Sequence, residues 1–431
     1  MMQTKAELTL PVQSPLFDHL LDEIHSRSFP KIQGLVALAN ITVLHHDKDK
    51  SAQLQHLHTL ADLYRVEGPE QDTNCYYQDL GELDIRWEYH TEFSTYTFLR
   101  LNRGEPAFNI CPWSLLPEDW SQSIPGHLIS ATHIDVQPVE PGKNQLHKLF
   151  GVTPVAASQV SESNAQIWAS FRACNNGFDR LLVVDQGLTQ IQIGRLLRSI
   201  LELSSYRMMT LLAVPASREL LPKIMKMEKE LAGITLELSK LNINSDNQKS
   251  LLAQLSILSA QLESLIADNQ GRFDACNAYL DIVHNRLNEL KEHELSGLPT
   301  LTDFLRRRLE PAGKTSASLK QRMLNMSNRI EKASDLLRTN INLSLEEQNQ
   351  DLLKALNRRS HIQLRLHQLV ESVSMIAISY YLVQLLGYML VLPKPWLTLF
   401  SKEQVIAVSV PFVVGAVWYV LHRLKRRWRK E

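Results

Sequence analysis

The stretch VSMIAISYYLVQLLGYMLVL, residues 373–392, decides how this chain is organised. It has 20 residues and no Asp, Glu, Lys or Arg, so as a helix it can cross about 30 Å of hydrocarbon. A second apolar run, VIAVSVPFVVGAVWYVL (residues 405–421), contains Pro411 and Gly415, which membrane helices tolerate. Charge-free runs of this length are rare in soluble cores. We therefore predict two C-terminal transmembrane helices.

Basic residues flank both predicted spans, and they fall on the same side. No acidic residue occurs between residues 355 and 370, before the first span, and the tail at residues 422–431 holds six Lys or Arg against one acid. Since Lys and Arg are retained on the cytoplasmic side, both ends should lie there, in a bacterial inner membrane, with residues 393–404 outside. The orienting residues are Arg358, Arg359, Arg423, Lys425, Arg426 and Arg427.

The sequence before the first predicted span is typical of helix. Residues 314–386 include no Gly and no Pro over 73 positions, which predicts one helix of roughly 110 Å that runs into the membrane. Upstream, we expect helices at 191–214, ended by Pro215, at 216–241, and at 300–309, ended by Pro311. Leucines spaced four and three apart over 251–290 predict a coiled coil. A helix this long needs partner helices, so we predict a homo-oligomer.

The first part of the chain predicts a mixed α/β domain. Its clearest strand is residues 83–93, where apolar and polar residues alternate, with a tight turn or bulge near Ser94. Further strands are expected at 94–99, 128–136, 166–174 and 181–184, and a short amphipathic helix at 16–24. The fold class is an α+β cytoplasmic head with a mixed sheet, a long helical coiled-coil stalk and two transmembrane helices. The predicted segments are 1–188 (head), 189–312 (helical and coiled-coil region), 313–372 (stalk helix), 373–392 (first span), 393–404 (outer loop), 405–421 (second span) and 422–431 (basic tail).

Composition excludes several classes of protein. The chain has 46 Lys plus Arg and 46 Asp plus Glu, so its formal net charge is zero, and it is strongly basic only at the tail. A nucleic-acid partner is therefore not expected, whereas the lipid bilayer is. The four cysteines are far apart in sequence, which argues against disulfides and a zinc site. The N-terminus has no apolar segment of the length that a signal peptide needs. No protein partner can be named.

No catalytic constellation appears in the sequence. The chain has no G-x-S-x-G, no P-loop, no G-x-G-x-x-G and no H-E-x-x-H. We therefore expect a protein that is not an enzyme and that binds no organic cofactor.

One face of the first predicted span carries polar side chains. His367, Glu371, Ser374 and Tyr381, together with the apolar residues 378 and 385, recur at helical spacing. This stripe predicts either a pore lining, with Glu371 concentrating cations at the inner mouth, or a helix–helix contact face. Both interpretations remain open.

A second candidate site lies on the predicted strand 83–93. Glu88, His90 and Glu92 alternate along it, so they would project from one face, and two carboxylates with an imidazole can bind a divalent cation. The alternative is that they form the polar face of an amphipathic strand. A divalent cation is the one candidate ligand that the sequence suggests.

Several sequence blocks resemble a known family. They include EIHSRSFP (23–30), WEYHTEFSTYTF (87–98), FDRLLVVDQGL (178–188) and the run from residue 336 to 381. They span nearly the whole chain and are similar to a family of uncharacterised membrane-anchored bacterial proteins, defined as a domain of unknown function. That family implies no activity.

The layout also loosely resembles CorA-type magnesium channels, in arrangement but not in motif. That resemblance implies a homo-oligomer whose first span lines a pore. CorA-type channels carry Gly-Met-Asn at the outer end of this span, whereas this chain reads Gly387-Tyr388-Met389-Leu390. Two functions therefore remain: an oligomeric cation channel or transporter that is not selective for magnesium, or a membrane-tethered scaffold or sensor that transports nothing.

Overall fold

The computed structural model describes residues 34–45, 49–151, 155–239, 245–295, 297–389 and 402–428, together with residues 14, 17 and 32. The chain divides into two compact units. The first comprises Met1–Leu241 and Ala253–Ala333, and the second comprises Asn242–Leu252 and Ser334–Glu431. Apart from residue 17, the helix predicted at 16–24 lies outside the described residues.

The first unit contains one mixed sheet, in which the described residues form nine strands. Their order is β2-β3-β4-β1-β5-β8-β7-β6-β9. All neighbours pair antiparallel except β5 and β8, which are parallel. The strands are β1 (Val36–Leu44), β2 (Cys75–Asp79), β3 (Asp84–Tyr89), β4 (Phe93–Leu101), β5 (His127–Gln137), β6 (Ala156–Val160), β7 (Ala165–Ala173), β8 (Asp179–Asp185) and β9 (His293–Glu294).

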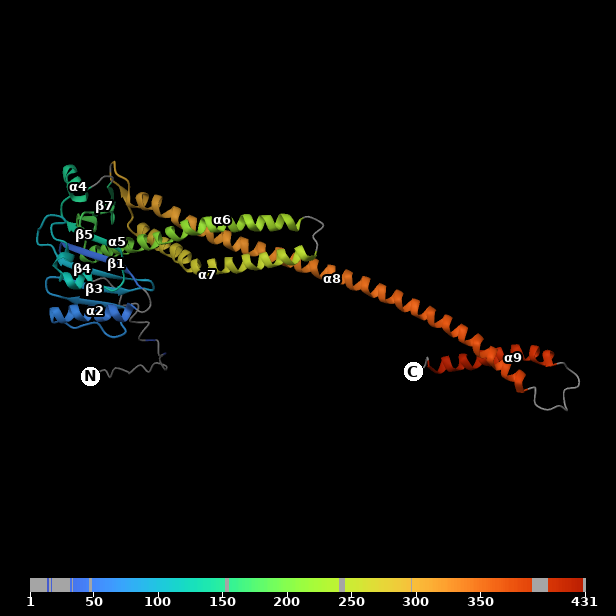
Figure 1. Ribbon diagram of the computed structural model, residues 1–431. Coiled ribbons are helices and arrows are strands. Elements are labelled where there is room, and N and C mark those ends of the chain that lie inside the picture. The colour runs from blue at the N-terminus through green and yellow to red at the C-terminus, as the bar shows by residue number, and fades with distance from the viewer. Residues whose placement is uncertain are drawn as a thin grey trace, which may run out of the picture. The chain divides into compact units, whose positions relative to one another are not determined.

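Helices cover both faces of this sheet (Figure 1). On one face, α2 (Asp49–Tyr64), the 3-10 turn η1 (Pro112–Leu115) and α3 (Glu118–Gln122) enclose a core with Trp87 and Phe98. Near α4 (Lys143–Phe150), a smaller cluster continues this layer. On the other face, α5 (Gln190–Leu211) packs on β1, β5 and β8 with the end of α7 and the start of α8. These layers confirm the predicted mixed sheet with helices.

The strand predictions hold except at one turn. The strands expected at 94–99, 128–136, 166–174 and 181–184 correspond to β4, β5, β7 and β8. The prediction of one strand over 83–93, with a turn near Ser94, was wrong: β3 ends at Tyr89 and β4 begins at Phe93. The backbone N–H of His90 donates to the carbonyl of Phe93 at 2.8 Å and closes the hairpin between them.

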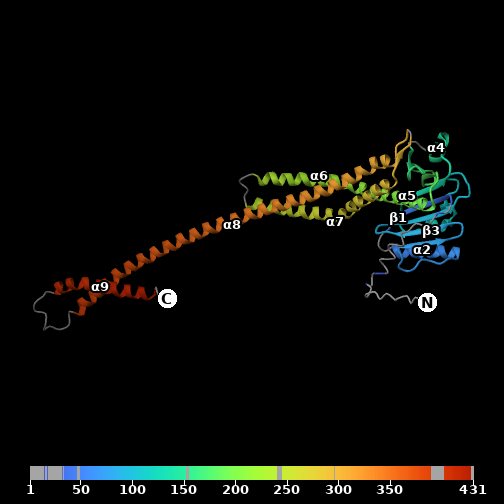
Figure 2. The ribbon, with the colours of Figure 1, turned by 180° about the vertical axis from the view of Figure 1, so that it is seen from behind.

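Three helices of the first unit pack side by side, as Figures 1 and 2 both show. They are α6 (Ala213–Leu238), the part of α7 (Ser245–Glu289) from residue 253 onward, and the start of α8 (Leu301–Met389) as far as residue 333. Arg322 on α8 donates two hydrogen bonds to Glu228 on α6, at 2.9 and 2.6 Å. The predicted leucine seam of α7 is buried: Leu255 and Leu262 are at most 1% exposed. The register of a coiled coil stays a prediction.

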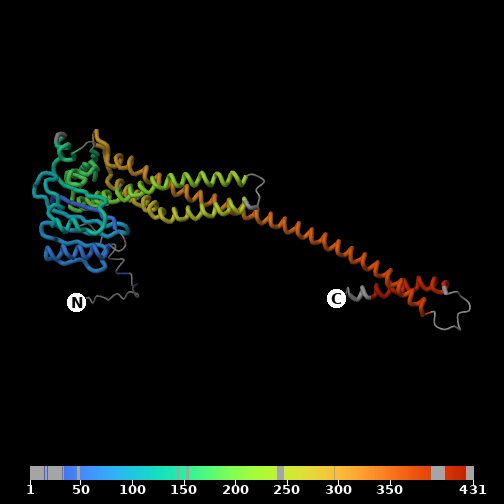
Figure 3. Tube along the Cα trace, in the orientation of Figure 1, coloured from blue at the N-terminus to red at the C-terminus, as the bar shows by residue number. Residues whose placement is uncertain are grey.

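Of the two helix ends predicted at proline, one is confirmed and one was wrong. The break predicted at Pro215 falls three residues earlier, at Leu212 between α5 and α6, and Pro215 lies in the first turn of α6, where a helix tolerates proline. Pro311 lies inside α8, which is continuous over 89 residues, so no boundary occurs at residue 312 (Figure 3). Proline removes one backbone hydrogen bond from a helix, here the bond to the Arg307 carbonyl, and α8 continues through Pro311 despite this loss. The helix predicted over 314–386 is confirmed and extends beyond both ends.

The second unit contains α8 from residue 334 onward and α9 (Lys402–Trp428). Three helical segments of the described chain are long and apolar enough to cross a membrane: Asn247–Glu289, Leu301–Met389 and Glu403–Arg423. The last two contain the predicted spans, and the first is additional. Residues 393–401 of the predicted outer loop lie outside the described residues, and the predicted tail begins inside α9.

Candidate functional site

The polar stripe predicted on the first span lies on α8 in the second unit. His367 and Ser374 are exposed, Tyr381 is 66% exposed, and Glu371 is partly buried. With about 100° of rotation per residue, these four side chains fall within about 80° of one another around the helix. The helical face expected from the sequence is therefore present.

Helix α9 packs on a different face of α8. Ser379 and Val417 are buried to 6% and 8% exposure within this unit. At the turn end of the hairpin, a Cβ added to Gly387 would lie 3.5 Å from Ile406 Cδ1, which is ordinary van der Waals contact. Residues 375, 379 and 383, which are less exposed than their neighbours, lie about 120° around α8 from the middle of the stripe. The stripe is therefore left open by α9, with Glu371 at its border.

The basic residues that flank the spans lie on helices. Arg358 and Arg359 are exposed on α8, and Arg423 is exposed on α9. Lys425, Arg426 and Arg427 lie in the last turns of α9. Arg358, Arg359 and Arg423 are therefore accessible, and the orientation that the basic residues predict stays a prediction.

The structure does not bring Glu88, His90 and Glu92 together as a metal site. Glu88 on β3 accepts a hydrogen bond from Arg86 at 2.8 Å, and the His90 ring stacks on Phe93 in the turn. Glu92 accepts from Arg272 at 3.1 Å and from Tyr279 at 2.8 Å, both on α7. Among the described residues, no group of three or more His, Cys, Asp or Glu is placed to hold a metal ion. The turn at 90–92 breaks the alternation on which that prediction depended.

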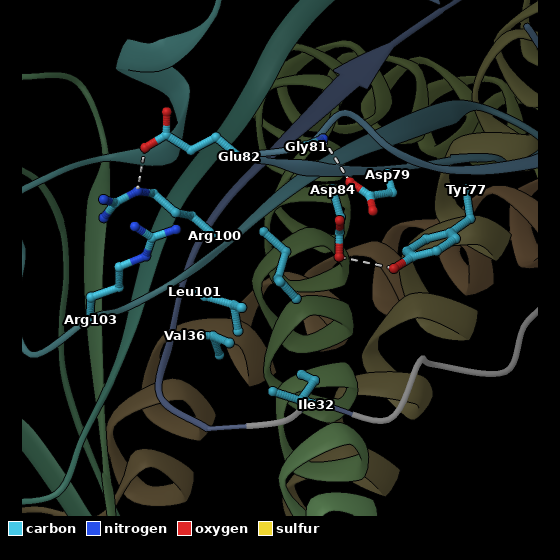
Figure 4. A pocket seen from close by; sticks show the side chains of 11 residues that line it. Ile32, Val36, Tyr77, Asp79, Gly81, Glu82, Asp84, Arg100, Leu101 and Arg103 are labelled. Carbon is cyan, nitrogen blue, oxygen red and sulfur yellow. Dashed lines mark hydrogen bonds and ion pairs between the residues drawn. The ribbon is translucent and has the colours of Figure 1, made fainter. Parts of the chain in front are cut away.

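A cavity of about 280 Å³ lies beside the β2–β3 hairpin (Figure 4). Asp84 accepts a hydrogen bond from the Tyr77 hydroxyl at 2.9 Å, and Glu82 pairs with Arg100 at 3.4 Å. Burial, reinforced by the Asp84 hydrogen bond, raises the pKa of Tyr77 to about 12. Burial also raises the pKa of the Asp84 carboxyl. The described lining holds no Ser, Cys or His, so it offers no pair of nucleophile and base.

A second cavity, of about 220 Å³, lies between the sheet and helices α5 and α7. We call it the arginine cavity, because Arg86 from β3, Arg198 from α5 and Arg286 from α7 all line it. Glu202 on α5 pairs with both helical arginines, and its distance to the Nε of Arg198 is 2.8 Å. Charged side chains from three elements therefore converge on one cavity that is open to solvent.

Electrostatics keep Glu88 ionised in this cavity. Burial raises the pKa of the Glu88 carboxyl, but the hydrogen bond from Arg86 and the charges of Arg86, His90 and Arg198 outweigh burial and leave it below its ordinary value. Sequence reasoning found Glu88 and His90 but not the arginines, which are more than 80 positions apart in the chain. The one available signal was the pair Arg198 and Glu202, four residues apart on a predicted helix.

Comparison with known proteins places the chain in a family without assigning an activity. No curated protein matches the chain. The profile of a family described as "protein of unknown function (DUF3422)" matches residues 13–428, which is nearly the whole sequence. The chain therefore belongs to this family of proteins of unknown function.

Proposed function

We propose that the chain is a membrane-anchored homo-oligomer whose C-terminal helices form a conduit for cations. Residues 373–389 of α8 and 405–421 of α9 would be its two spans, with α8 at the centre and α9 outside. The observation that carries this proposal is the polar stripe on α8, which α9 leaves open. Ser374 and Tyr381 lie inside the proposed span, and His367 and Glu371 lie just before it. Polar side chains in a span face other helices or water, where they form hydrogen bonds.

The third apolar segment, in α7, is assigned to the head and not to the membrane. Leu255 and Leu262 are buried against the other helices of the first unit. By contrast, α8 and α9 expose large apolar side chains throughout the proposed spans, such as Ile376 at 71% and Phe412 at 76%. Apolar surface of this extent is stable in contact with lipid or with other copies of the chain.

The orientation in this proposal follows from the basic residues. Arg358, Arg359 and Arg423 lie at the same end of the two antiparallel spans, so that end would face the cytoplasm of a bacterial cell. The head and both termini would then be cytoplasmic, and the connector after α8 would lie outside.

Assembly around α8 is supported by the part of the helix between the bundle and the first span. Every residue from 345 to 370 is exposed, and large apolar side chains recur there. Leu345, Leu352 and Leu356 fall on one face of the helix. Leucines on an exposed helical face gain stability when copies of the helix pack together.

The chemistry proposed for the stripe is attraction of a cation and its partial dehydration. The Glu371 carboxylate would raise the local cation concentration at the inner mouth, and the hydroxyls of Ser374 and Tyr381 would replace water ligands. The segment Gly387-Tyr388-Met389-Leu390 carries no side-chain amide. We therefore propose a conduit without the magnesium selectivity of CorA-type channels.

Ion flux in liposomes tests this proposal. The purified full chain should release trapped cations, and the double variant Glu371→Gln with Ser374→Ala should lower that flux at least several-fold. Matched controls are Glu403→Gln, at the first turn of α9, and Ser372→Ala, on another face of α8. Equal flux from the double variant and the wild type, at equal incorporation, would overturn the assignment of the stripe.

The alternative is a membrane-tethered sensor or scaffold that transports nothing. The arginine cavity in the head favours it, because such a cavity serves ligand recognition without any need for a conduit. Absence of flux from an intact wild-type oligomer would decide for this alternative.

A further inference from the structure

We propose that the arginine cavity binds a small soluble oxyanion, a phosphate or a short dicarboxylate. This inference is independent of conduction through the membrane, since it concerns the first unit alone. It starts from the sheet face that α5 covers.

Two polar rows cross this face of the sheet. In one row, Arg86 pairs with Thr97, and Thr97 pairs with Asn40. In the next row, Glu88 pairs with Thr95, and Thr95 pairs with Thr42. Residues paired across strands point to the same face, so both rows lie under α5. The rows continue onto β5 at Thr132 and Ser130, and Thr42 contacts the Ser205 hydroxyl of α5 at 2.8 Å. Beyond the rows, the same face carries the apolar side chains that a helix usually covers, such as Ile134 of β5 and Leu181 of β8.

The rows remain polar although they are buried. Asn40 is 1% exposed and donates to the Thr97 hydroxyl at 2.9 Å, but its Oδ1 has no hydrogen-bond partner among the described residues. Asn40 lines the cavity. A buried polar atom without a hydrogen-bond partner destabilises the folded state. A bound molecule that donates a hydrogen bond to Asn40 Oδ1 would remove this cost. A protonated phosphate oxygen or a bound water can donate this hydrogen bond.

The cavity also holds hydrogen-bond donors that the described chain does not use. Arg198 donates from Nε to Glu202, and its four terminal N–H groups have no partner in the described residues. Arg286 donates from Nε to Glu202 and from Nη1 to Glu289, at 2.5 Å for the second bond. Its Nη2 makes no hydrogen bond to the described chain. Guanidinium groups with free terminal nitrogens match the oxygens of carboxylate and phosphate.

Size and charge narrow the class of ligand. About 220 Å³ corresponds to roughly seven waters, which suits a small anion. The lining itself carries three arginines against Glu88 and Glu202, a net positive charge that favours an anion. Glu289, outside the lining, pairs with Arg286 and offsets part of this charge, so the unused guanidinium donors and not the net charge carry the argument.

Binding and thermal unfolding of the full chain in detergent test this proposal. Inorganic phosphate and succinate are titrated separately against sodium chloride of equal ionic strength, by calorimetry and by melting temperature. We expect one site per chain for at least one of the two anions, and a melting temperature raised by several degrees. The two titrations distinguish phosphate from dicarboxylate chemistry.

Substitutions locate the site. Arg198→Gln and Arg286→Gln should each weaken binding at least tenfold, whereas Arg195→Gln should not, because Arg195 is exposed on α5 one turn earlier and outside the lining. The Arg198 side chain is 40% exposed, so its loss should leave the fold intact even if Arg286→Gln does not fold. No response to either anion beyond that to chloride, or equal binding by Arg198→Gln and wild type, would overturn the proposal.

Discussion

Replacing Leu345, Leu352 and Leu356 together by Gln should dissociate the proposed oligomer. These leucines lie on the part of α8 where every side chain from residue 345 to 370 is exposed. At about 100° per residue they fall within about 40° of one another, so they form a stripe that one neighbouring helix can cover. Glutamine keeps helix propensity close to that of leucine, so the change removes apolar contact and not the helix.

The magnitude follows from the exposed fractions. The three leucines are 52%, 60% and 57% exposed. Burial of a whole leucine side chain stabilises by about 1.5–3 kcal/mol, so covering the exposed half contributes about 1–1.5 kcal/mol for each residue. Three residues contribute about 3–4.5 kcal/mol for each chain, which corresponds to about two to three orders of magnitude in the association constant.

Native mass spectrometry of the detergent-solubilised full chain over a dilution series measures this change. Wild type should stay oligomeric at concentrations where the triple variant is monomeric. The matched control is Leu236→Gln on α6, a leucine that is 63% exposed but lies outside this stripe. If the triple variant and wild type dissociate at the same concentration, or if wild type is monomeric throughout, the stripe does not hold copies together.

Three further substitutions test the head and the bundle by denaturant unfolding. Gly126→Ala should cost about 2–4 kcal/mol, because Gly126 has a φ of 117° and a Cβ there would lie 2.7 Å from a backbone oxygen. An unfolding free energy of Gly126→Ala equal to that of wild type would contradict the predicted strain at this position. Glu228→Gln should lower the unfolding free energy by about 1 kcal/mol, because it breaks the ion pair with Arg322, whose side chain is only one-third exposed. The same change should have no effect on stability in a variant that already lacks Arg322. Glu88→Gln should cost about 2–3 kcal/mol at pH 7, since the Arg86 pair holds the Glu88 pKa below 4.5 in the folded state. The contribution of the ionised Glu88 to stability is complete above pH 4.5 and is lost as the pH falls through the folded-state pKa. The unfolding free energies of wild type and Glu88→Gln should therefore converge in acid. A difference in unfolding free energy that does not change with pH would contradict the lowered pKa of Glu88.

Local sequence pattern predicted the long helix and most of the strands, because each depends on neighbours in sequence. A run without Gly or Pro, ending in charge-free residues, leaves few alternatives to helix, and α8 extends beyond both predicted ends. The same reasoning failed at Pro311, because packing of this part of α8 on α5 and α7 overrides the cost of one missing hydrogen bond. At the β3–β4 turn, the alternation continued across residues 90–92 and concealed the hairpin.

One interior strand of the sheet, β1, was not predicted at all. β1, Val36–Leu44, is buried on both faces, so it shows no alternation between buried and exposed positions. Its sequence VALANITVL also includes Asn40 and Thr42, which interrupt the apolar run expected of a buried strand. The pairing of β1 with β4 and β5 explains these two residues. Asn40 and Thr42 each pair with polar residues on both neighbouring strands, so each continues a polar row across the sheet.

The two polar residues that hide β1 in the sequence are also the best indication of a ligand site. The sheet register carries the row of Asn40 through Thr97 to Arg86, from β1 to the β3–β4 hairpin, which is distant from β1 in the sequence. Had this face only to support α5, apolar residues would stabilise it more, as Ile134 of β5 and Leu181 of β8 do under the same helix. Replacing Asn40 and Thr97 together by Leu and Val should therefore preserve or increase the stability of the ligand-free chain and abolish the response of its melting temperature to phosphate or succinate. A double variant that unfolds would instead mean that the polar rows serve the fold itself.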